Sequence, residues 1–427
     1  MEMLMIEGGA SLAGEVTISG SKNSALPIVI ATMLSDKPSL ISNVPDLADT
    51  RFLCDLLSSF GAVCQFDLGR VHMECHRISN NVADYDLVRK MRASILVLAP
   101  LLVRFGRAIV SLPGGCAIGS RPVDIHLSGL TRLGAVIEVK EGYIYARLKE
   151  GFFVGAEFEL PVPSVGATEN LIMAAVMARG TTVLKRAARE PEVVELCHAL
   201  NRAGAHIQGI GTSTLIIKGV TSLSGIEHRI RPDRIEAGTF IAMAAATRST
   251  ITLKDLCRDD LSNVIERFER AQVRFVSSSP KDLDQIDLTV EGPEELIATD
   301  IETSSYPGFP TDMQAQFMAS MTVAKGSSMI YERIFENRMM HVPELRRMGA
   351  DISLRNGIAT VNGKPGLSGA PVMATDLRAS ASLVIAALIA KGTSEIRRVY
   401  HLDRGYEDLE RKLFGLGARI KRCQQIN

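Results

Sequence analysis

A short motif, a helix that ends in a Gly-Ala turn, recurs six times along the chain and constrains the fold more than any other feature. The copies are about 70 residues apart. Five of them have glycine at the helix end, where a left-handed residue is the usual stop, and the fourth has glutamine. The turns lie at Gly61, Gly134, Gly204, Gln272, Gly349 and Gly417. Equal units of this size predict a repeat architecture.

A second helix, rich in Ala, Met, Leu and Ile, recurs with the same period. These segments are apolar nearly all round, which is typical of helices that are buried on every side. Short strands with alternating apolar and polar residues follow most of the Gly-Ala turns. The apolar segments are residues 24–34, 92–105, 166–179, 235–247, 312–324 and 377–390.

Each repeat therefore reads strand–helix–strand–helix–strand–strand. Because the strands alternate, we expect the sheets outside and the apolar helices inside. The predicted fold class is α/β, with two inside-out, barrel-like domains of three βαβαββ repeats each. We expect one domain over residues 22–230 and a second over residues 231–427 plus 1–21, because the N-terminal strand has no partner in the first repeat. A cleft between two such domains is the default place for an active site.

Composition and charge narrow the class of protein. Lys plus Arg equals Asp plus Glu at 48 each, so no overall basic field would attract nucleic acid or an anionic membrane. The start of the chain lacks the pattern of a signal peptide, and the longest apolar run, residues 93–103, is too short to span a bilayer. Seven cysteines without a Cys-x-x-Cys pair indicate reduced thiols and no metal site. We therefore expect a cytoplasmic protein.

A glycine-rich segment, residues 112–124, carries three glycines around Cys116 and then Arg121 and Asp124. Glycines permit close backbone approach, so the segment predicts a loop. A thiol in such a loop is accessible, and an arginine nearby favours its thiolate form. Taken alone, a surface loop with an idle cysteine is the simpler interpretation.

Cations stand at the start of three apolar helices, at Lys22, Arg92 and Arg378. Cations at this end oppose the helix dipole. An anion docked there would bond the free N–H groups and would be neutralised by these side chains. Ordinary N-capping accounts for neighbours such as Ser21 and Asp376, but it does not account for the cations. The pattern favours an anion-binding site.

Several longer stretches resemble the UDP-N-acetylglucosamine 1-carboxyvinyltransferases of the enolpyruvyl transferase family. The resemblance covers essentially the whole chain and implies two inside-out domains of three repeats each, in agreement with the repeats above. The stretches are residues 19–27, 112–124, 163–168, 309–317, 334–338, 373–382 and 403–406.

This resemblance implies a reaction. The enolpyruvyl group of phosphoenolpyruvate passes to the 3′-hydroxyl of UDP-N-acetylglucosamine, and phosphate leaves through a tetrahedral ketal intermediate. The step is the first committed one of bacterial peptidoglycan synthesis, and so serves cell wall biogenesis, cell shape and cell division. The implied partners are the two small-molecule substrates. No cofactor and no metal are implied, and the epoxide fosfomycin is the family's inhibitor.

The resemblance also implies roles for single residues. Cys116 is the general acid and can form a covalent adduct with the substrate. Asp312 is the base or orienting acceptor for the sugar hydroxyl, and Lys22 and Arg404 complete the catalytic set. Phosphoenolpyruvate carries a phosphate and a carboxylate and needs several cations. The cations implied are Lys22, Arg121 and Arg404, with Arg92 and Arg378 nearby. The remaining substrate contacts implied are Asn23, Arg121, Pro122, Val123, Asp124, Ile125, Ser164, Val165, Gly166 and Ile334.

One position departs from the family pattern, because Val162 stands where some members have lysine. Uridine recognition on that side must then rely on backbone groups. Within the fold, the alternative is the sibling 3-phosphoshikimate 1-carboxyvinyltransferase, which lacks the cysteine-bearing loop. Alternatives of another class are a non-catalytic repeat scaffold and the RNA-cyclase-like folds, and the near-zero net charge speaks against nucleic acid.

Overall fold

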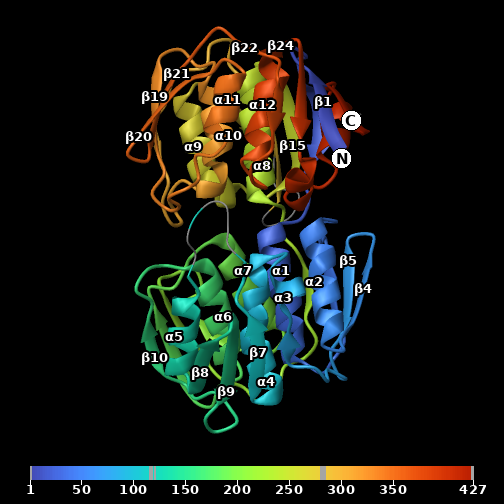
Figure 1. Ribbon diagram of the computed structural model, residues 1–427, viewed down its shortest axis with the longest axis vertical. Coiled ribbons are helices and arrows are strands. Elements are labelled where there is room, and N and C mark those ends of the chain that lie inside the picture. Colours follow the sequence, from blue (N-terminus) through green and yellow to red (C-terminus); the bar gives the residue numbers. More distant parts are fainter. Residues whose placement is uncertain (1, 115–118, 120–121, 279–284, 425–427) are drawn as a thin grey trace. The chain divides into compact units, whose positions relative to one another are not determined.

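The computed structural model describes residues 2–114, 119, 122–278 and 285–424, which form two compact units (Figure 1). Unit 1 contains the described residues of 2–19 and 232–424 together with Gly119. Unit 2 contains the other described residues of 20–231. In the part of the chain that is described, no helix combines the length and the apolar character needed to cross a membrane.

Unit 2 is built from three successive repeats of strands and helices, with short 3-10 helices labelled η. Its elements are α1 (Lys22–Ala31), η1 (Thr32–Leu34), β3 (Ser39–Ser42), α2 (Ala48–Ser59), β4 (Val63–Asp67), β5 (Arg70–Glu74), β6 (Val82–Ala83), α3 (Tyr85–Val88), η2 (Arg92–Val97), α4 (Leu98–Phe105), β7 (Arg107–Ser111), α5 (Asp124–Arg132), β8 (Ala135–Lys140), β9 (Tyr143–Leu148), β10 (Glu157–Glu159), α6 (Val165–Ala175), β11 (Thr181–Lys185), α7 (Pro191–Arg202), β12 (His206–Gln208), β13 (Thr214–Lys218) and β14 (Glu227–Arg229).

Unit 1 repeats the same order and adds the N-terminal strands. Its elements are β1 (Glu2–Glu7), β2 (Ala13–Thr17), α8 (Arg234–Thr247), β15 (Thr250–Leu256), η3 (Arg258–Leu261), α9 (Ser262–Arg270), β16 (Arg274–Ser277), β17 (Ile286–Glu291), β18 (Ile301–Glu302), η4 (Thr311–Met313), α10 (Gln314–Met321), β19 (Ser327–Tyr331), α11 (Val342–Arg347), β20 (Asp351–Arg355), β21 (Ile358–Asn362), β22 (Leu367–Ser368), β23 (Pro371–Met373), α12 (Ser380–Ile389), β24 (Ala390–Lys391), β25 (Thr393–Arg397), η5 (Val399–Arg404), α13 (Leu409–Gly415) and β26 (Arg419–Gln424).

One strand pattern recurs in every four-stranded sheet of the described residues. A short edge strand runs parallel to a second strand, and the third and fourth strands follow antiparallel. The sheets of unit 2 have the orders β14-β3-β5-β4, β6-β7-β9-β8 and β10-β11-β13-β12, and those of unit 1 β2-β15-β17-β16, β18-β19-β21-β20 and β23-β25-β1-β26. The same topology in each sheet is the structural form of the sequence repeat.

The sheet of the last repeat takes its third strand from the other end of the chain. β1 lies between β25 and β26 and is antiparallel to both, with Leu4 opposite Ile396 and Arg422. In unit 2 a comparable closure occurs, because β14 pairs with β3 of the first repeat. Segments far apart in sequence therefore complete each unit.

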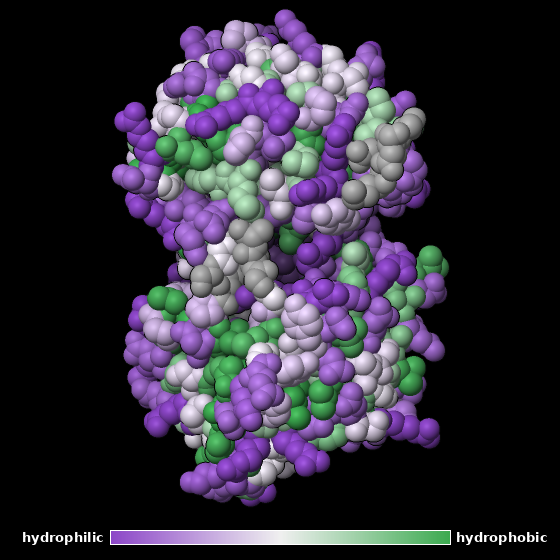
Figure 2. Space-filling view, viewed as in Figure 1, coloured by the Kyte–Doolittle hydropathy of each residue, from purple (hydrophilic) through white to green (hydrophobic). Residues whose placement is uncertain are grey.

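The apolar helices form the centre of each unit. In unit 1, α8, α10 and α12 contact one another, and almost all their residues are buried (Figure 1). In unit 2, α6 contacts both η2 and α4. The strands alternate as expected, so that β5 buries Val71 and Met73 and exposes its other side chains. On the face drawn in Figure 2, hydrophilic residues are interspersed with hydrophobic ones over both units. The buried helices and the outer sheets of alternating strands confirm the predicted fold class.

The six predicted helix stops are confirmed. The backbone angle φ is positive at every one of them, from 73° at Gln272 to 104° at Gly134 and Gly204. Glycine tolerates this conformation without strain, which explains its use in the other five copies. The apolar helices are also present, but α6 already ends at Ala175 and α12 begins only at Ser380.

Candidate functional site

The start of α1 is tightly held in unit 2. Ser21 caps the helix, because its side chain accepts a hydrogen bond of 3.3 Å from the Ser24 N–H. A side-chain carbon at Gly20 would lie 1.7 Å from the carbonyl oxygen of Asn43, so only glycine fits there. Asn23, in the first turn, is half-buried. The start of α1, which carries the predicted cation Lys22, is therefore held in one position by its cap and by close packing.

Lys22 forms a buried ion pair. Its Nζ lies 2.6 Å from Oδ2 of Asp49, and the two side chains are only 7% and 2% exposed. Asp49 comes from the first turn of α2. Sequence reasoning missed Asp49, because an aspartate in the first turn of an amphipathic helix is an ordinary helix-start residue.

A neutral histidine, His126, lies near enough to Arg92 to be affected by its charge. His126 of α5 is buried, and burial together with the charge of Arg92 lowers the pKa of His126 to about 4. Its Nδ1 lies 3.1 Å from Nδ2 of Asn170, an amide nitrogen that can only donate. Nδ1 of His126 is therefore the acceptor, and Nε2 carries the proton. Arg92 itself begins η2 and is half-buried.

Asn170 joins three helices of unit 2. Its Oδ1 accepts from the N–H of Ala99 at 3.2 Å, and its Nδ2 also lies 3.3 Å from the carbonyl oxygen of Ile95. Neither His126 nor Asn170 was predicted, since they are 44 residues apart in sequence and stand in no shared motif.

Two predicted substrate stretches come together at the starts of α5 and α6. These helices contact each other, and a side-chain carbon at Gly166 would lie 3.4 Å from Cε1 of His126. Ser164 caps α6 by accepting a 3.4 Å hydrogen bond from the Ala167 N–H. The other predicted residues of these stretches are exposed or half-buried, namely Pro122, Val123, Asp124, Ile125 and Val165. Cys116 and Arg121 lie outside the described residues.

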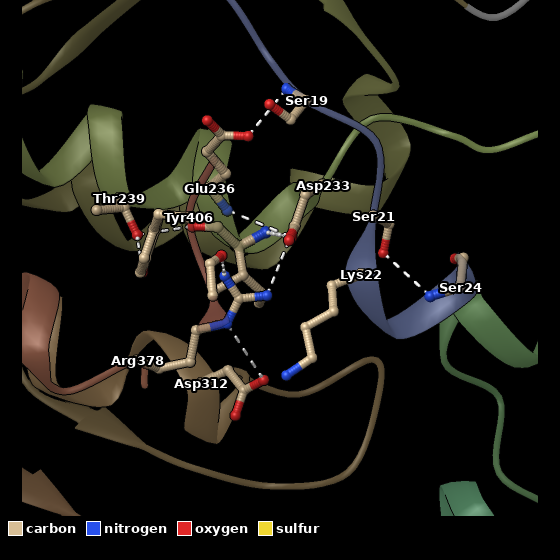
Figure 3. Close-up of polar contacts among 12 residues, drawn as sticks. Ser19, Ser21, Lys22, Ser24, Asp233, Glu236, Thr239, Asp312, Arg378 and Tyr406 are labelled. Atoms are coloured by element: carbon tan, nitrogen blue, oxygen red, sulfur yellow. Dashed lines mark hydrogen bonds and ion pairs between the residues drawn. The ribbon is translucent and has the colours of Figure 1, made fainter. Parts of the chain in front are cut away.

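In unit 1 the predicted carboxylate Asp312 faces two guanidinium groups. Oδ1 of Asp312 accepts a 2.7 Å hydrogen bond from Nη2 of Arg338, and Oδ2 lies 4.0 Å from Nε of Arg378 (Figure 3). The Asp312 charge raises the pKa of Arg338 although burial alone would lower it. Arg338 was not predicted as a site residue, although it ends the matched stretch 334–338.

Arg378 is fixed by contacts on several sides. Its Nη2 lies 2.8 Å from Oδ2 of Asp233, its Nη1 donates to the carbonyl oxygen of Gly405 at 2.9 Å, and its guanidinium lies 5.1 Å from the ring centre of Tyr406. Burial is the largest single effect and would lower the pKa of Arg378, but Asp233, Tyr406 and Asp312 together outweigh it and raise this pKa. Asp233 also caps α8 by accepting from the Ile235 N–H at 2.8 Å. Figure 3 shows Arg378 between Asp233 and Asp312.

Glu332 organises the backbone around Ile334. It accepts hydrogen bonds from the N–H groups of Ile334 at 2.8 Å and Phe335 at 3.1 Å. It also accepts from the hydroxyl of Thr311 at 2.9 Å, which in turn accepts from Arg338 at 3.0 Å. The predicted residue Ile334 is thereby joined to Asp312 through a short polar chain, and its side chain is 37% exposed.

The last predicted cation, Arg404, is half-buried at the end of η5. Burial and the Arg404 charge lower the pKa of nearby His401. Among the described residues, no group of three or more His, Cys, Asp or Glu side chains is arranged to hold a metal ion. In unit 1, the predicted residues Asp312 and Arg378 thus lie beside Arg338, which was not predicted. In unit 2, the predicted residues lie at helix starts, and the neutral imidazole of His126, which was not predicted, lies near Gly166.

Comparison with known proteins identifies relatives over the whole chain. Residues 6–413 match the family model described as EPSP synthase (3-phosphoshikimate 1-carboxyvinyltransferase). The chain is 50% identical over 425 residues to a UDP-N-acetylglucosamine 1-carboxyvinyltransferase from Geobacter metallireducens, and all of both chains is covered. It is 52% identical over 424 residues to the protein of that name from Shewanella amazonensis, with 99% of this chain and 100% of that one covered.

Solved structures show the same fold. The enolpyruvyl transferase NikO from Streptomyces tendae aligns with a TM-score of 0.88 at 25% identity, covering 100% of this chain and 99% of that one. EPSP synthase from Acinetobacter baumannii aligns with a TM-score of 0.77 at 16% identity and covers all of both chains. The latter likeness concerns the fold alone.

Proposed function

This chain belongs to the EPSP synthase (3-phosphoshikimate 1-carboxyvinyltransferase) family, and we infer that within this family it acts on UDP-N-acetylglucosamine. It transfers the enolpyruvyl group of phosphoenolpyruvate to the 3′-hydroxyl of UDP-N-acetylglucosamine and releases phosphate. The observation that carries this conclusion is identity of about half over the full length of relatives that bear this acceptor in their name. The reaction begins peptidoglycan synthesis, and we place it in the cytoplasm.

We assign the acceptor role for the sugar hydroxyl to Asp312. Addition requires that the hydroxyl loses its proton while the vinyl carbon of phosphoenolpyruvate gains one. The Arg338 hydrogen bond at 2.7 Å supports this assignment, because it fixes the position of one carboxylate oxygen. Cys116 is the proposed proton donor to the vinyl carbon.

We assign the binding of the phosphate and carboxylate of phosphoenolpyruvate to a set of five cations. The proposed set is Lys22, Arg92, Arg121, Arg378 and Arg404. The proposal is supported for Lys22 by its fixed place in the first turn of α1, because the positive end of a helix dipole attracts an anion. Arg378 is 1% exposed and already bonds Asp233 and Gly405, so within this set it favours the anion through its positive charge and through the placing of Asp312.

We assign the nucleotide sugar to the residues at the starts of α5 and α6, together with Asn23 and Ile334. Ser164, Val165 and Gly166 open α6, which is a good seat for a diphosphate. Neutral His126 supports this assignment, because a proton on Nε2 makes it a donor toward the Gly166 side. The proposed contacts in residues 122–125 precede and begin α5.

The test is phosphate release from phosphoenolpyruvate with two acceptors. We expect turnover with UDP-N-acetylglucosamine and none with shikimate 3-phosphate, the acceptor that the description of the family model makes the second candidate. Asp312→Asn is expected to abolish most turnover. Asp300→Asn is the control and should leave turnover unchanged, because Asp300 is exposed and its carboxylate accepts a hydrogen bond from the Met329 backbone N–H. Turnover with shikimate 3-phosphate alone would reverse the choice of acceptor.

A further inference from the structure

A buried chain of hydrogen bonds lies under Asp312 in unit 1. Nε2 of Gln316 lies 2.8 Å from the carbonyl oxygen of Asp312 and 3.1 Å from the hydroxyl of Tyr406. That hydroxyl lies 2.9 Å from Oγ1 of Thr239, which donates to the carbonyl oxygen of Ile235 at 2.8 Å. Gln316, Tyr406 and Thr239 are all buried, so water does not replace these bonds.

The donors and acceptors of this chain allow one direction only. The Thr239 hydroxyl has a single proton, which it gives to Ile235, so it must accept from Tyr406. Tyr406 has then used its own proton and must accept from Gln316. The amide of Gln316 has two protons. One goes to the Asp312 carbonyl oxygen, and the other is shared between the Tyr406 hydroxyl at 3.1 Å and the Thr239 hydroxyl at 3.3 Å. Burial raises the pKa of Tyr406, so its hydroxyl keeps the proton that the chain needs.

Tyr406 also touches the second group that faces Asp312. Its ring lies under the guanidinium of Arg378, 5.1 Å from ring centre to Cζ (Figure 3). Arg378 Nε has no hydrogen-bond partner among the described residues, although it is buried, and it faces Oδ2 of Asp312 at 4.0 Å. Tyr406 therefore acts on Asp312 in two ways. Through Gln316 it supports the backbone of Asp312, and by direct contact it supports the Arg378 guanidinium beside the Asp312 carboxylate.

We propose that Gln316 and Tyr406 are positioning residues for the transfer reaction, which set the distance between the Asp312 carboxylate and the Arg378 guanidinium. This inference rests on the proposed function of Asp312. Neither residue touches substrate in this proposal. Without the Tyr406 hydroxyl, the second Gln316 proton keeps only the longer contact of 3.3 Å to the Thr239 hydroxyl, and the amide is held less firmly against the Asp312 carbonyl oxygen. The carboxylate then loses its fixed place, which slows the chemical step and leaves substrate affinity nearly unchanged.

The test is Tyr406→Phe, which removes the hydroxyl and keeps the ring under Arg378. We expect kcat to fall about tenfold, the rate equivalent of one net hydrogen bond, while KM for either substrate changes less than about twofold. The matched control is Tyr143→Phe, since the Tyr143 hydroxyl accepts a hydrogen bond from the Tyr85 N–H in unit 2. The control is expected to keep the kcat of the unaltered enzyme.

A second variant keeps the proposal testable if Tyr406→Phe does not fold. Gln316→Met has nearly the same length and lacks the amide, and we expect the same fall in kcat. Since both residues act through one chain, the double variant should lose no more than the worse single variant. Wild-type kcat in a folded Tyr406→Phe or Gln316→Met variant, a rise in KM alone, or additive losses would each overturn the proposal.

Phosphate release by the unaltered enzyme distinguishes failure of the proposed function from failure of the positioning role. If it releases no phosphate with UDP-N-acetylglucosamine, the acceptor assignment fails, and the same variants are compared with shikimate 3-phosphate. A split of kcat from KM with that acceptor would still support the positioning role.

Discussion

The ammonium group of Lys22 lies 2.6 Å from the carboxylate of Asp49, and both side chains are buried within unit 2. A buried pair of this kind need not add net stability, but removing one partner leaves an uncompensated charge in a place without water. Lys22 therefore has a structural role in this ion pair and a proposed role in the reaction. Suitable variants separate the two roles.

We expect Asp49→Asn to lower the free energy of unfolding by roughly 3 kcal/mol, because it leaves the Lys22 charge unpaired. The double variant Lys22→Met/Asp49→Leu removes both charges and should recover most of this loss. We expect this double variant to release no phosphate, because it lacks Lys22, the proposed cation for phosphoenolpyruvate. Urea unfolding and the phosphate assay measure the two effects separately, and an active double variant would exclude Lys22 from the site.

Arg338 is expected to be needed for turnover, because its hydrogen bond at 2.7 Å fixes the Asp312 carboxylate. Arg338→Lys keeps the charge but loses the planar pair of donors that reach both Asp312 and Thr311. We expect kcat to fall by about 10²-fold, the loss typical for one preorganised donor. Arg333→Lys is the control, since Arg333 is exposed and pairs with Glu302. Equal rates for the two variants would count against the role of Arg338.

Two buried histidines are expected to lower the free energy of unfolding as the pH falls from about 6.5 to 4. Burial lowers the pKa of His126 and of His341 to about 4, whereas an unfolded histidine has a value near 6.5. Above pH 6.5 both states are neutral and the histidines contribute nothing. As the pH falls, the unfolded state takes up protons first, and folding is disfavoured.

Going from pH 7 to pH 5, each of these histidines should lower the free energy of unfolding by roughly 2 kcal/mol. His126→Asn should remove about half of the combined loss, and urea unfolding at the two pH values measures it. The exposed His206 serves as the control, so His206→Asn should leave the pH dependence as it is. An unchanged slope in His126→Asn would show that His126 already titrates normally in the folded state.

Cys116 is expected to be the residue that an epoxide such as fosfomycin alkylates. The six described cysteines are buried or half-buried, whereas the sequence places Cys116 in a glycine-rich segment. Cys116→Asp should retain turnover, because a carboxylic acid can still donate a proton, and it should escape inactivation. Peptide mass spectrometry locates the adduct, and an adduct elsewhere in an inactivated enzyme with Cys116 intact would contradict the assignment.

The sequence predicted the repeat better than it predicted the site. The positive φ at each Gly-Ala turn depends only on the residues of that turn, so the local sequence is sufficient to predict it. Even Gln272 has the expected positive φ. The apolar helices were equally visible, because burial on every side removes polar residues from the whole segment. Helix ends differ by a few residues, since final turns depend on local capping rather than on apolar pattern.

The partners of the cations could not be read from the sequence. Arg378 pairs with Asp233, which is 145 residues away, and His126 bonds Asn170 across 44 residues. A cation at the start of an apolar helix indicates a negative partner, but it does not say whether that partner is a ligand or a carboxylate of the protein. Only the packing of helices from different repeats brings these side chains together.

The place of β1 between β25 and β26 has a consequence for synthesis on the ribosome. β1 leaves the ribosome long before its hydrogen-bonding partners, which lie at residues 393–397 and 419–424. The residues of unit 2 emerge in between and can fold while this strand is still unpaired. Until those partners are made, the side chains of Leu4 and Ile6, which are buried in the folded protein, stay without their cover, and we expect a chaperone to protect this strand.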